Sequence, residues 1–169
     1  MKNKFGISLV IGVLTCSCIN DEEPEYTSLL PGDECPQFRV EMSDGRTFST
    51  SNFKGIGGMI VFFNTDCGDC RRELPEIQKV YEYLDGKGLL ERIICIAREE
   101  DDAQIDDYWS STGLTLPYSP QPDRKIYNLF ASGGIPRVYV IDKDLTITST
   151  FDDDPMPSAE QLINLIANL

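Results

Sequence analysis

The alternation of hydrophobic and polar residues predicts strands and helices in turn along the chain. Between residues 38 and 48, apolar and polar positions alternate on both sides of an Asp44-Gly45 turn, a pattern typical of a β-hairpin. Residues 59–63 are continuously apolar and follow two glycines, which predicts a central strand buried on both faces. After Cys70, apolar residues recur at helical spacing until Gly86 interrupts them, which predicts a long helix.

The rest of the chain continues this alternation. We expect a buried strand at 92–97, a helix at 101–111, an irregular proline-containing loop at 116–122, a short helix at 123–130 capped by Asp123, strands at 138–141 and 146–151, and a last helix opened by a capping box of Ser158 and Gln161. A hairpin, a βαβ unit, and then a hairpin and a helix are typical of an α/β sheet with helices on both faces. The 169 residues, 41% of them hydrophobic, suffice for one such domain.

The first residues are typical of an export signal rather than of the fold. Two lysines supply a positive start, and residues 7–14 form an apolar core much shorter than the about 20 residues that span a bilayer. A short buried N-terminal helix is the alternative. The cysteines that follow resemble a bacterial lipoprotein signal, in which the cysteine after the cleavage point is lipidated. The resemblance implies a signal peptide at 1–17 and lipidation of Cys18, with Cys16 as the alternative.

Residues 18–33 are predicted to be the lipidated cysteine and a flexible acidic tether, because they contain prolines and no apolar period. Within them, the acidic run 21–23 resembles the surface-export signals of some Gram-negative lipoproteins; an ordinary solvated tether is the alternative. The resemblance implies an extracytoplasmic protein, lipid-anchored to the cell envelope on the periplasmic or cell-surface face of a Gram-negative outer membrane. The folded domain is expected at 34–169.

Composition removes several classes of chemistry. The chain contains no histidine, which excludes Ser-His-Asp and Cys-His nucleophiles, histidine-ligated zinc or haem, and imidazole acid–base steps. Its 28 acidic and 15 basic residues give a net charge of −13, so we expect no nucleic acid partner, because binding polyphosphate requires a basic surface. Cleavage before Cys18 removes two lysines and takes the net charge from −13 to −15. This charge repels anionic lipid, so only the anchor would hold the protein to a membrane.

Two cysteines three positions apart, Cys67 and Cys70, follow the predicted central strand and begin the long helix. Unpaired amides and the dipole at a helix N-terminus stabilise a thiolate, the reactive form of cysteine. A second cysteine one turn inside the helix can then close a disulfide and release a bound substrate. A zinc ligand pair and a purely structural disulfide are the alternatives. A closed zinc site needs four ligands, and the chain has neither a histidine nor a second such pair.

Three further features accompany this pair. Pro75 lies inside the predicted helix, Ile135-Pro136 follows two glycines just before a predicted strand, and residues 31–38 precede the hairpin. With the cysteines, these features resemble the thioredoxin fold, and the opening segment is similar to that of its TlpA/ResA-type branch of extracytoplasmic, often membrane-anchored thiol–disulfide oxidoreductases. The resemblance covers residues 31–169. It implies a thioredoxin-like α/β fold with a central mixed β-sheet, helices on both faces and an N-terminal β-hairpin.

The resemblance also implies roles for single residues. Cys67 matches the attacking cysteine, Cys70 the buried resolving cysteine, and Glu73 a glutamate near the pair that serves proton transfer; an exposed first-turn acid is the alternative for Glu73. Ile135 and Pro136 match a loop whose backbone pairs with an extended substrate, with a cis bond before the proline; an ordinary trans turn is the alternative. The implied partners are exported proteins with disulfides and a membrane or periplasmic electron donor. Neither a cofactor nor a metal is expected.

The chain departs from the family pattern at three places. Asp66 replaces the tryptophan that usually precedes the first cysteine, and Gly68-Asp69 replaces the common Gly-Pro between the cysteines. Val61 stands where thioredoxin itself has a buried acid. The only tryptophan, Trp109, is expected to be a packing residue. These departures leave the disulfide exchange intact and affect the substrate range and the redox potential.

The charges beside the cysteines predict the direction of the reaction. Asp66 and Asp69 flank Cys67 and repel negative charge, while Arg71 and Arg72 are expected to lie along the helix and point towards solvent. Like-charge neighbours disfavour a thiolate, and a less stabilised thiolate makes the reduced form less favoured than the disulfide. We therefore expect a reductant, with a potential nearer to that of thioredoxin, about −270 mV, than to the about −120 mV of strong oxidants.

Two other functions are compatible with the fold. A peroxiredoxin shares the fold and the opening segment, but it carries a threonine three residues and a proline seven residues before its peroxidatic cysteine, where this chain has Asn64 and Ile60. A membrane-tethered binding module without turnover is the second alternative, and Asp66 in place of tryptophan favours it.

Two cysteines lie outside the pair and the signal. Cys95 falls within a predicted buried strand, where a free cysteine packs as a small hydrophobic residue. In an exported protein, Cys35 and Cys95 can instead form a disulfide.

Overall fold

The computed structural model describes residues 27–169. The predicted signal peptide at 1–17, the lipidation site Cys18 with its alternative Cys16, and the first part of the predicted tether lie outside the described residues. Within residues 27–169, no helix is both long enough and apolar enough to cross a membrane.

The described residues form strands, α-helices and short 3-10 helices in an order close to the predicted one. The elements are β1 (Arg39–Glu41), β2 (Thr47–Ser49), η1 (Thr50–Phe53), β3 (Gly58–Phe63), α1 (Gly68–Asp85), η2 (Leu90–Arg92), β4 (Ile93–Ala97), α2 (Asp102–Thr112), β5 (Tyr118–Ser119), η3 (Tyr127–Leu129), β6 (Arg137–Ile141), β7 (Ile147–Phe151) and α3 (Ala159–Ala167).

Five strands form one mixed sheet in the order β5-β4-β3-β6-β7. β4 runs parallel to the central strand β3, with Cys95 opposite Val61, and β6 runs antiparallel to it, with Val138 opposite Val61. β5 is parallel to β4, and β7 is antiparallel to β6. β1 and β2 pair as a separate antiparallel hairpin. The predicted mixed sheet and N-terminal hairpin are therefore confirmed.

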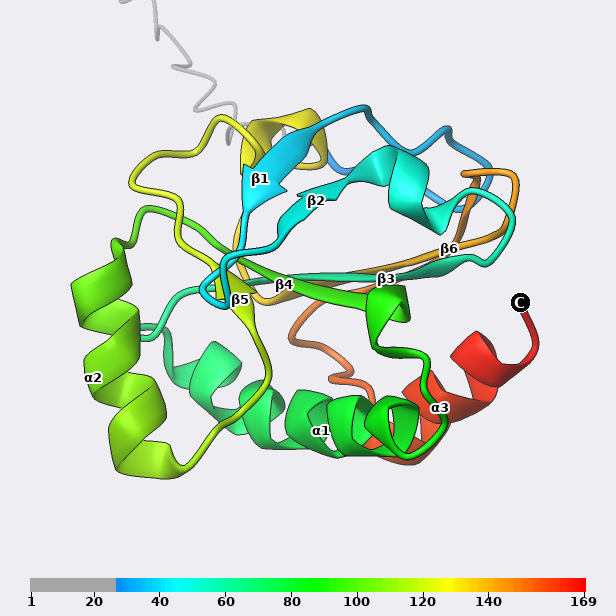
Figure 1. Ribbon diagram of the computed structural model, residues 1–169. Coiled ribbons are helices and arrows are strands. Elements are labelled where there is room, and N and C mark those ends of the chain that lie inside the picture. Colours follow the sequence, from blue (N-terminus) through cyan, green and yellow to red (C-terminus); the bar gives the residue numbers. More distant parts are fainter. Residues whose placement is uncertain (1–26) are drawn as a thin grey trace, which may run out of the picture.

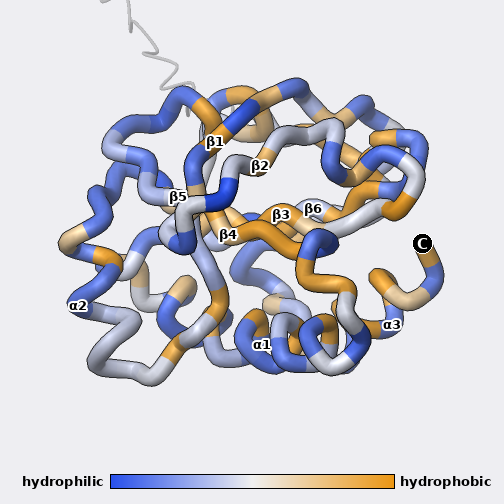
Figure 2. Tube along the Cα trace, in the orientation of Figure 1, coloured by the Kyte–Doolittle hydropathy of each residue, from blue (hydrophilic) through white to orange (hydrophobic). Residues whose placement is uncertain are grey.

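Side chains of β3 pack on both faces of the sheet, because successive residues of a strand point in opposite directions. Phe62 packs against Tyr127 and Phe130 on the side of the hairpin. Phe63 packs on the other side, against Trp109, with ring centroids 5.1 Å apart. Figure 1 shows α1 and α3 together on the side opposite the hairpin, and Figure 2 shows hydrophobic residues concentrated along β3 and β4 between these layers. All six residues of β3 are buried, as the sequence predicts.

The helices begin where side chains can accept their first N–H groups. α1 begins directly after Cys67. Asp101 caps α2 in a capping box with Gln104. At α3, the hydroxyl of Ser158 accepts from the N–H of Gln161 (3.2 Å), which is one half of the capping box expected there.

Two elements differ from the prediction. The loop at 116–122 contains the two-residue strand β5, which forms an edge of the sheet. The helix expected at 123–130 is reduced to the 3-10 helix η3. Asp123 does not cap it, because its carboxylate accepts from the N–H of Lys125 (2.9 Å) in a local turn. The secondary structure of such short segments depends on the elements packed against them rather than on their own sequence pattern.

The first described residues lie against the domain. The N–H of Leu29 donates to the carbonyl of Phe130 (2.8 Å), and the N–H of Gly32 donates to the carbonyl of Ile147 (2.8 Å). Residues 27–33, which the sequence assigns to the tether, are therefore hydrogen-bonded to the fold, and the domain begins earlier than residue 34.

Candidate active site

Cys67 lies between β3 and α1, as the N-cap residue of the helix. Its N–H donates to the carbonyl of Asn64 (3.2 Å), and its sulfur accepts from the N–H of Cys70 (3.4 Å). The first turn of a helix has N–H groups without partners inside the helix and the positive end of the dipole, so negative charge on this sulfur is favoured. Cys67 is half-buried, which leaves its sulfur within reach of a substrate.

Cys70 lies one turn into α1 and is fully buried. Burial raises the pKa of its thiol far above the ordinary value, and the hydrogen bond with Cys67 and the charge of Glu73 raise it further. Both cysteines are thiols in this structure. The pair therefore consists of one accessible sulfur at a helix end and one protonated, shielded sulfur behind it.

The loop before β6 approaches Cys67 from the other side. The bond between Ile135 and Pro136 is cis, not trans. The thiol of Cys67 donates to the carbonyl of Ile135, with a sulfur–oxygen distance of 3.5 Å. The structure thus brings together the cysteine and the loop that the sequence singles out separately.

Glu73 lies in the first part of α1 and is buried, with only 1% of its surface exposed. The alternative of an exposed first-turn acid is therefore wrong. Its Oε1 atom has no hydrogen-bond partner among the described residues. Burial raises the pKa of Glu73 from 4.5 to about 8, because the low-dielectric interior disfavours the carboxylate. Glu73 lies three residues after Cys70, about one helical turn along α1, so the two side chains share one face of the helix.

The arginines after Cys70 are exposed to solvent, as expected, and they also pair with the acids that flank Cys67. Arg71 lies 3.5 Å from the carboxylate of Asp66, and Arg72 forms an ion pair with Asp69. All four side chains are at least partly exposed. Each acid beside Cys67 is therefore paired with a cation, which reduces the repulsion on which the expected reducing potential depends.

Glu100 is a buried acid of this site that sequence reasoning missed. Only 2% of its surface is exposed, and its carboxylate accepts from both the N–H (2.8 Å) and the hydroxyl of Thr65. Burial raises the pKa of Glu100, and the two hydrogen bonds from Thr65 oppose this shift. Glu100 thereby fixes the chain two residues before Cys67. The sequence could not identify it, because it belongs to a run of four acids that look alike.

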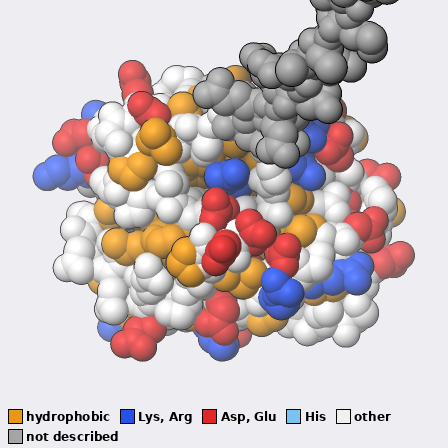
Figure 3. All heavy atoms as spheres, turned by 180° about the vertical axis from the view of Figure 1, so that it is seen from behind, with side chains coloured by type: hydrophobic (Ala, Val, Ile, Leu, Met, Phe, Trp, Pro, Cys, Tyr) orange, Lys and Arg blue, Asp and Glu red, His pale blue; other side chains and the backbone are white. Residues whose placement is uncertain are grey.

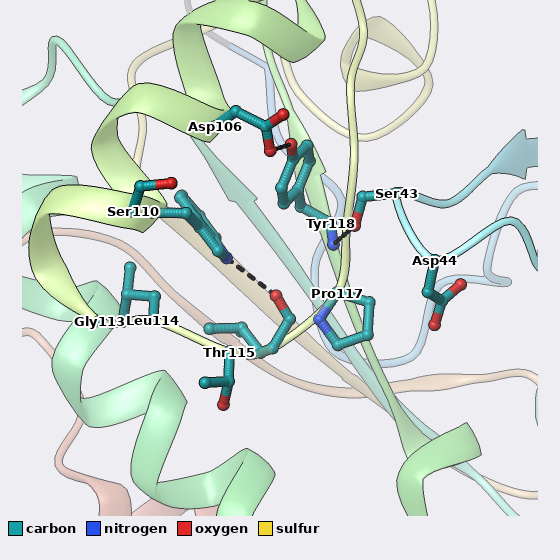
Figure 4. Close-up of a pocket in the computed structure, with 11 residues that line it drawn as sticks. Ser43, Asp44, Asp106, Ser110, Gly113, Leu114, Thr115, Pro117 and Tyr118 are labelled. Atoms are coloured by element: carbon teal, nitrogen blue, oxygen red, sulfur yellow. Dashed lines mark hydrogen bonds between the residues drawn. The ribbon is translucent and has the colours of Figure 1, made fainter.

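A hollow of about 420 Å³ lies away from the cysteine pair, between α2, the segment after it and the turn at Ser43 (Figure 4). Trp109 contributes to its wall, and its indole N–H donates to the carbonyl of Leu116 (2.9 Å). Tyr118, whose ring centroid lies 5.0 Å from that of Trp109, also lines the hollow, and its hydroxyl donates to Asp106 (2.5 Å). Trp109 is 7% exposed and packs against Phe63, so it is a packing residue, as expected.

Cys35 and Cys95 are both buried, and both are free thiols. Burial raises the pKa of Cys35 to about 12, and it raises the pKa of Cys95 as well. The structure therefore shows the free-thiol alternative rather than a disulfide. Within residues 27–169, no group of three or more cysteine or acidic side chains is placed to hold a metal ion.

The family model described as the AhpC/TSA family matches residues 31–150. The chain belongs to the AhpC/TSA family. Among its relatives, the thiol-disulfide oxidoreductase ResA of Bacillus thuringiensis (strain Al Hakam) is 29% identical over 113 residues, which cover 67% of this chain and 64% of that protein. This match therefore spans slightly less than two thirds of the relative. ResA from a strain of Bacillus cereus is 27% identical over 152 residues, which cover 85% of this chain and 84% of the relative.

Solved structures show the fold of this AhpC/TSA family member. A solution structure from Bacteroides thetaiotaomicron, described provisionally as a protein disulfide isomerase, superimposes with a TM-score of 0.72 and 25% identity, over 85% of this chain and 89% of the other. The mixed sheet, the hairpin and this likeness establish the thioredoxin-like fold of the TlpA/ResA type.

Proposed function

We propose that the protein is a thiol–disulfide oxidoreductase that reduces disulfides of exported proteins through a mixed-disulfide intermediate. One observation carries the proposal: the Cys67 sulfur lies at a helix N-terminus and 3.5 Å from the Ile135 carbonyl, with Cys70 buried behind it. Relatives named thiol-disulfide oxidoreductase support the same reaction.

The first step is attack by Cys67. Its thiolate displaces one sulfur of a substrate disulfide, so the substrate S–S bond breaks and a new S–S bond joins Cys67 to the substrate. The displaced sulfur leaves as a thiolate and takes up a proton. The N-terminus of α1 stabilises the attacking thiolate, and the partial exposure of Cys67 admits the substrate.

The second step is resolution by Cys70. Its thiol loses a proton and attacks the sulfur of Cys67, which closes the Cys67–Cys70 disulfide and releases the second substrate thiolate. Two electrons have then passed from the pair to the substrate. Glu73 in its ionised form is the group we propose to take the Cys70 proton, because it is buried one helical turn after that thiol and has one carboxylate oxygen without a partner among the described residues.

The loop at Ile135 and Pro136 is proposed to hold the substrate. In the thioredoxin-like fold that the chain resembles, the backbone before the cis proline pairs with an extended segment of the substrate. The short distance between the Ile135 carbonyl and the Cys67 sulfur supports this role, because a segment paired there would lie beside the attacking atom.

The proposed location follows from the amino-terminal sequence, and the proposed partners follow from the likeness to thiol-disulfide oxidoreductases. We propose a protein exported by residues 1–17 and lipid-anchored through Cys18 in the cell envelope of a Gram-negative bacterium, supplied with electrons by a membrane or periplasmic donor. The net charge of −13 supports an anchor rather than attraction to anionic lipid, and it argues against nucleic acid. On the face in Figure 3, acidic side chains gather near the middle and basic ones lie around them.

Insulin reduction tests the proposed reaction. With dithiothreitol as the electron source, the full chain should speed the precipitation of insulin chains, and Cys67→Ser should not. Cys35→Ser is the matched control, because that thiol is buried outside the pair. If the full chain is no faster than dithiothreitol alone, the binding module is the better interpretation. If the protein consumes hydrogen peroxide faster than it reduces insulin, the peroxiredoxin alternative is the better interpretation.

A further inference from the structure

Hydrogen-bond donors from several parts of the fold converge on the loop before Pro136. The hydroxyl of Tyr127 donates to the carbonyls of Gly133 (3.1 Å) and Gly134 (2.5 Å). Guanidinium groups donate to the same stretch: Arg98 to Gly133 (3.1 Å), Arg124 to Ser132 (3.1 Å) and Arg137 to Gly134 (3.2 Å). The next carbonyl along the loop is that of Ile135, which accepts from the Cys67 thiol. We call the donor side chains Arg98, Arg124, Tyr127 and Arg137 the loop clamp.

Three side chains of the clamp, Arg98, Arg124 and Tyr127, also contact each other. Tyr127 is 1% exposed, and the guanidinium carbons of Arg98 and Arg124 lie 5.2 Å and 5.4 Å from the centroid of its ring. The carboxylate of Glu99 lies 3.5 Å from both guanidinium groups and offsets their charge. Stacking, ion pairing and hydrogen bonding therefore link these three side chains to one another and to the loop.

Arg98 also contacts the segment that leads to Cys67. It directly follows β4, and its N–H donates to the carbonyl of Phe63 (2.8 Å) at the end of β3. Its carbonyl accepts from the side-chain amide of Asn64 (3.0 Å). The carbonyl of Asn64 in turn accepts from the N–H of Cys67 (3.2 Å). The backbone of Arg98 thus holds the cysteine segment, while its side chain holds the loop on the other side of the sulfur.

We propose that Arg98 is a positioning residue that sets the distance between the Cys67 sulfur and the Ile135 carbonyl, and thereby the geometry in which a substrate disulfide meets the attacking atom. The inference rests on the proposed oxidoreductase function for its consequence in turnover. Its consequence for the Cys67 thiol can be measured without turnover. The positioning role and the oxidoreductase function can therefore fail separately. Asn64 and Arg98 together connect the two segments that flank the sulfur, and Tyr127 supports the same loop from within the core.

The test uses the full chain with Arg98→Met, which keeps the length of the side chain and removes its donors. Arg39→Met on β1 is the matched control, because Arg39 is exposed and far along the chain from the site. Thermal unfolding first establishes that each variant is folded. The rate of Cys67 alkylation by iodoacetamide is then measured against pH, and KM and kcat are measured for insulin reduction.

Loss of the clamp should move the Ile135 carbonyl away from the thiol. A hydrogen bond donated by a thiol holds the proton on the sulfur, so a thiol released from the Ile135 carbonyl should react about threefold faster across the alkylation profile in both Arg98→Met and Tyr127→Phe, the second of which keeps every charge. KM should rise about fivefold with kcat little changed, because a misplaced loop weakens substrate binding before the chemical step. Arg98→Lys, which keeps a cation and an N–H donor, should recover most of both effects.

A folded Arg98→Met protein with the alkylation profile of the wild type overturns the proposal, whether or not insulin is reduced. The proposal is also overturned if Arg39→Met shows the same change in its alkylation profile. If Arg98→Met does not fold, Tyr127→Phe decides, because it removes the hydroxyl donor and keeps the packed ring. Faster alkylation of Tyr127→Phe supports positioning by the clamp, and the alkylation profile of the wild type overturns it.

Discussion

The thiol of Cys67 donates a hydrogen bond to the backbone carbonyl of Ile135, 68 residues further along the chain. The antiparallel pairing of β3 and β6 makes this contact, because the residue pair Phe62 and Arg137 places the end of one strand beside the start of the other. Cys67 follows the first strand, and Ile135 precedes the second. A reactive sulfur and a backbone segment able to receive an extended peptide therefore share one edge of the sheet.

The two cysteines should behave differently when each is replaced. Cys67→Ser should abolish insulin reduction, because the other described thiols are buried. Cys70→Ser should still attack but accumulate mixed disulfides, since the resolving thiol is gone. Mass spectrometry of each variant after incubation with a disulfide peptide measures the adducts. Adducts on Cys67→Ser but none on Cys70→Ser would reverse the assignment.

Glu73 should make the stability of the protein depend on pH. Between its ordinary pKa of 4.5 and its raised pKa of about 8, the folded protein keeps a proton on Glu73 that the unfolded chain has released. Stability should therefore fall as pH rises through this window, by an amount on the order of a few kcal/mol. Glu73→Gln has no titrating group and should lose this contribution.

Urea unfolding at pH 5, 6.5 and 8 measures the effect. Asp85→Asn is the control, because Asp85 is an exposed acid on the same helix. We expect Glu73→Gln to gain stability relative to the wild type as pH rises, and Asp85→Asn to follow the wild type. Parallel pH curves for all three proteins would show that Glu73 ionises at an ordinary pKa.

The acids beside Cys67 should have little effect on the redox potential. Asp69 is paired with Arg72, and both side chains are exposed to water, so the charge that reaches the sulfur is screened. Asp69→Asn should change the midpoint of the Cys67–Cys70 couple by less than about 20 mV, the equivalent of about 1 kcal/mol. Equilibration with glutathione buffers measures it. A larger change would mean that Asp69 acts on the sulfur directly.

The same titration tests the direction of the reaction. A reductant should have its midpoint nearer to about −270 mV than to about −120 mV. The helix N-terminus beside Cys67 favours the thiolate and so opposes this expectation, while the full burial of Cys70 favours the disulfide over a charged pair. A midpoint above about −180 mV, the value for protein disulfide isomerase, would contradict a role as a reductant.

Membrane attachment should depend on Cys18. Replacing Cys18 by alanine should release the protein from the membrane fraction or block its maturation, because the apolar core of the signal is too short to anchor it. Cys16→Ala is the matched control and should remain attached. Cell fractionation followed by immunoblotting measures both. Release of Cys16→Ala with retention of Cys18→Ala would move the lipidation site to Cys16.

Local sequence patterns were sufficient for most of the fold. The apolar run of β3, the turn residues of the hairpin and the helical spacing of α1 each act within a few residues, so they predict their elements without knowledge of the rest of the chain. The placement of Cys67 and Cys70 at a strand–helix junction is also local. The proximity of Ile135 and Pro136 to the pair came from family resemblance, because no local pattern connects residues so far apart.

Only the tertiary structure decided which side chains share an environment. Glu73 and Asp69 are both acids near the start of α1, yet one is buried at the sheet and the other is paired with an arginine in water. Likewise, Glu100 accepts a hydrogen bond from Thr65 and Arg98 donates one to Gly133, because the fold places these residues side by side. Burial and hydrogen bonding depend on which surfaces pack together, and packing joins residues by their positions in space rather than along the chain. The chemistry of the cysteines can therefore be predicted from the sequence, but the side chains that position them cannot.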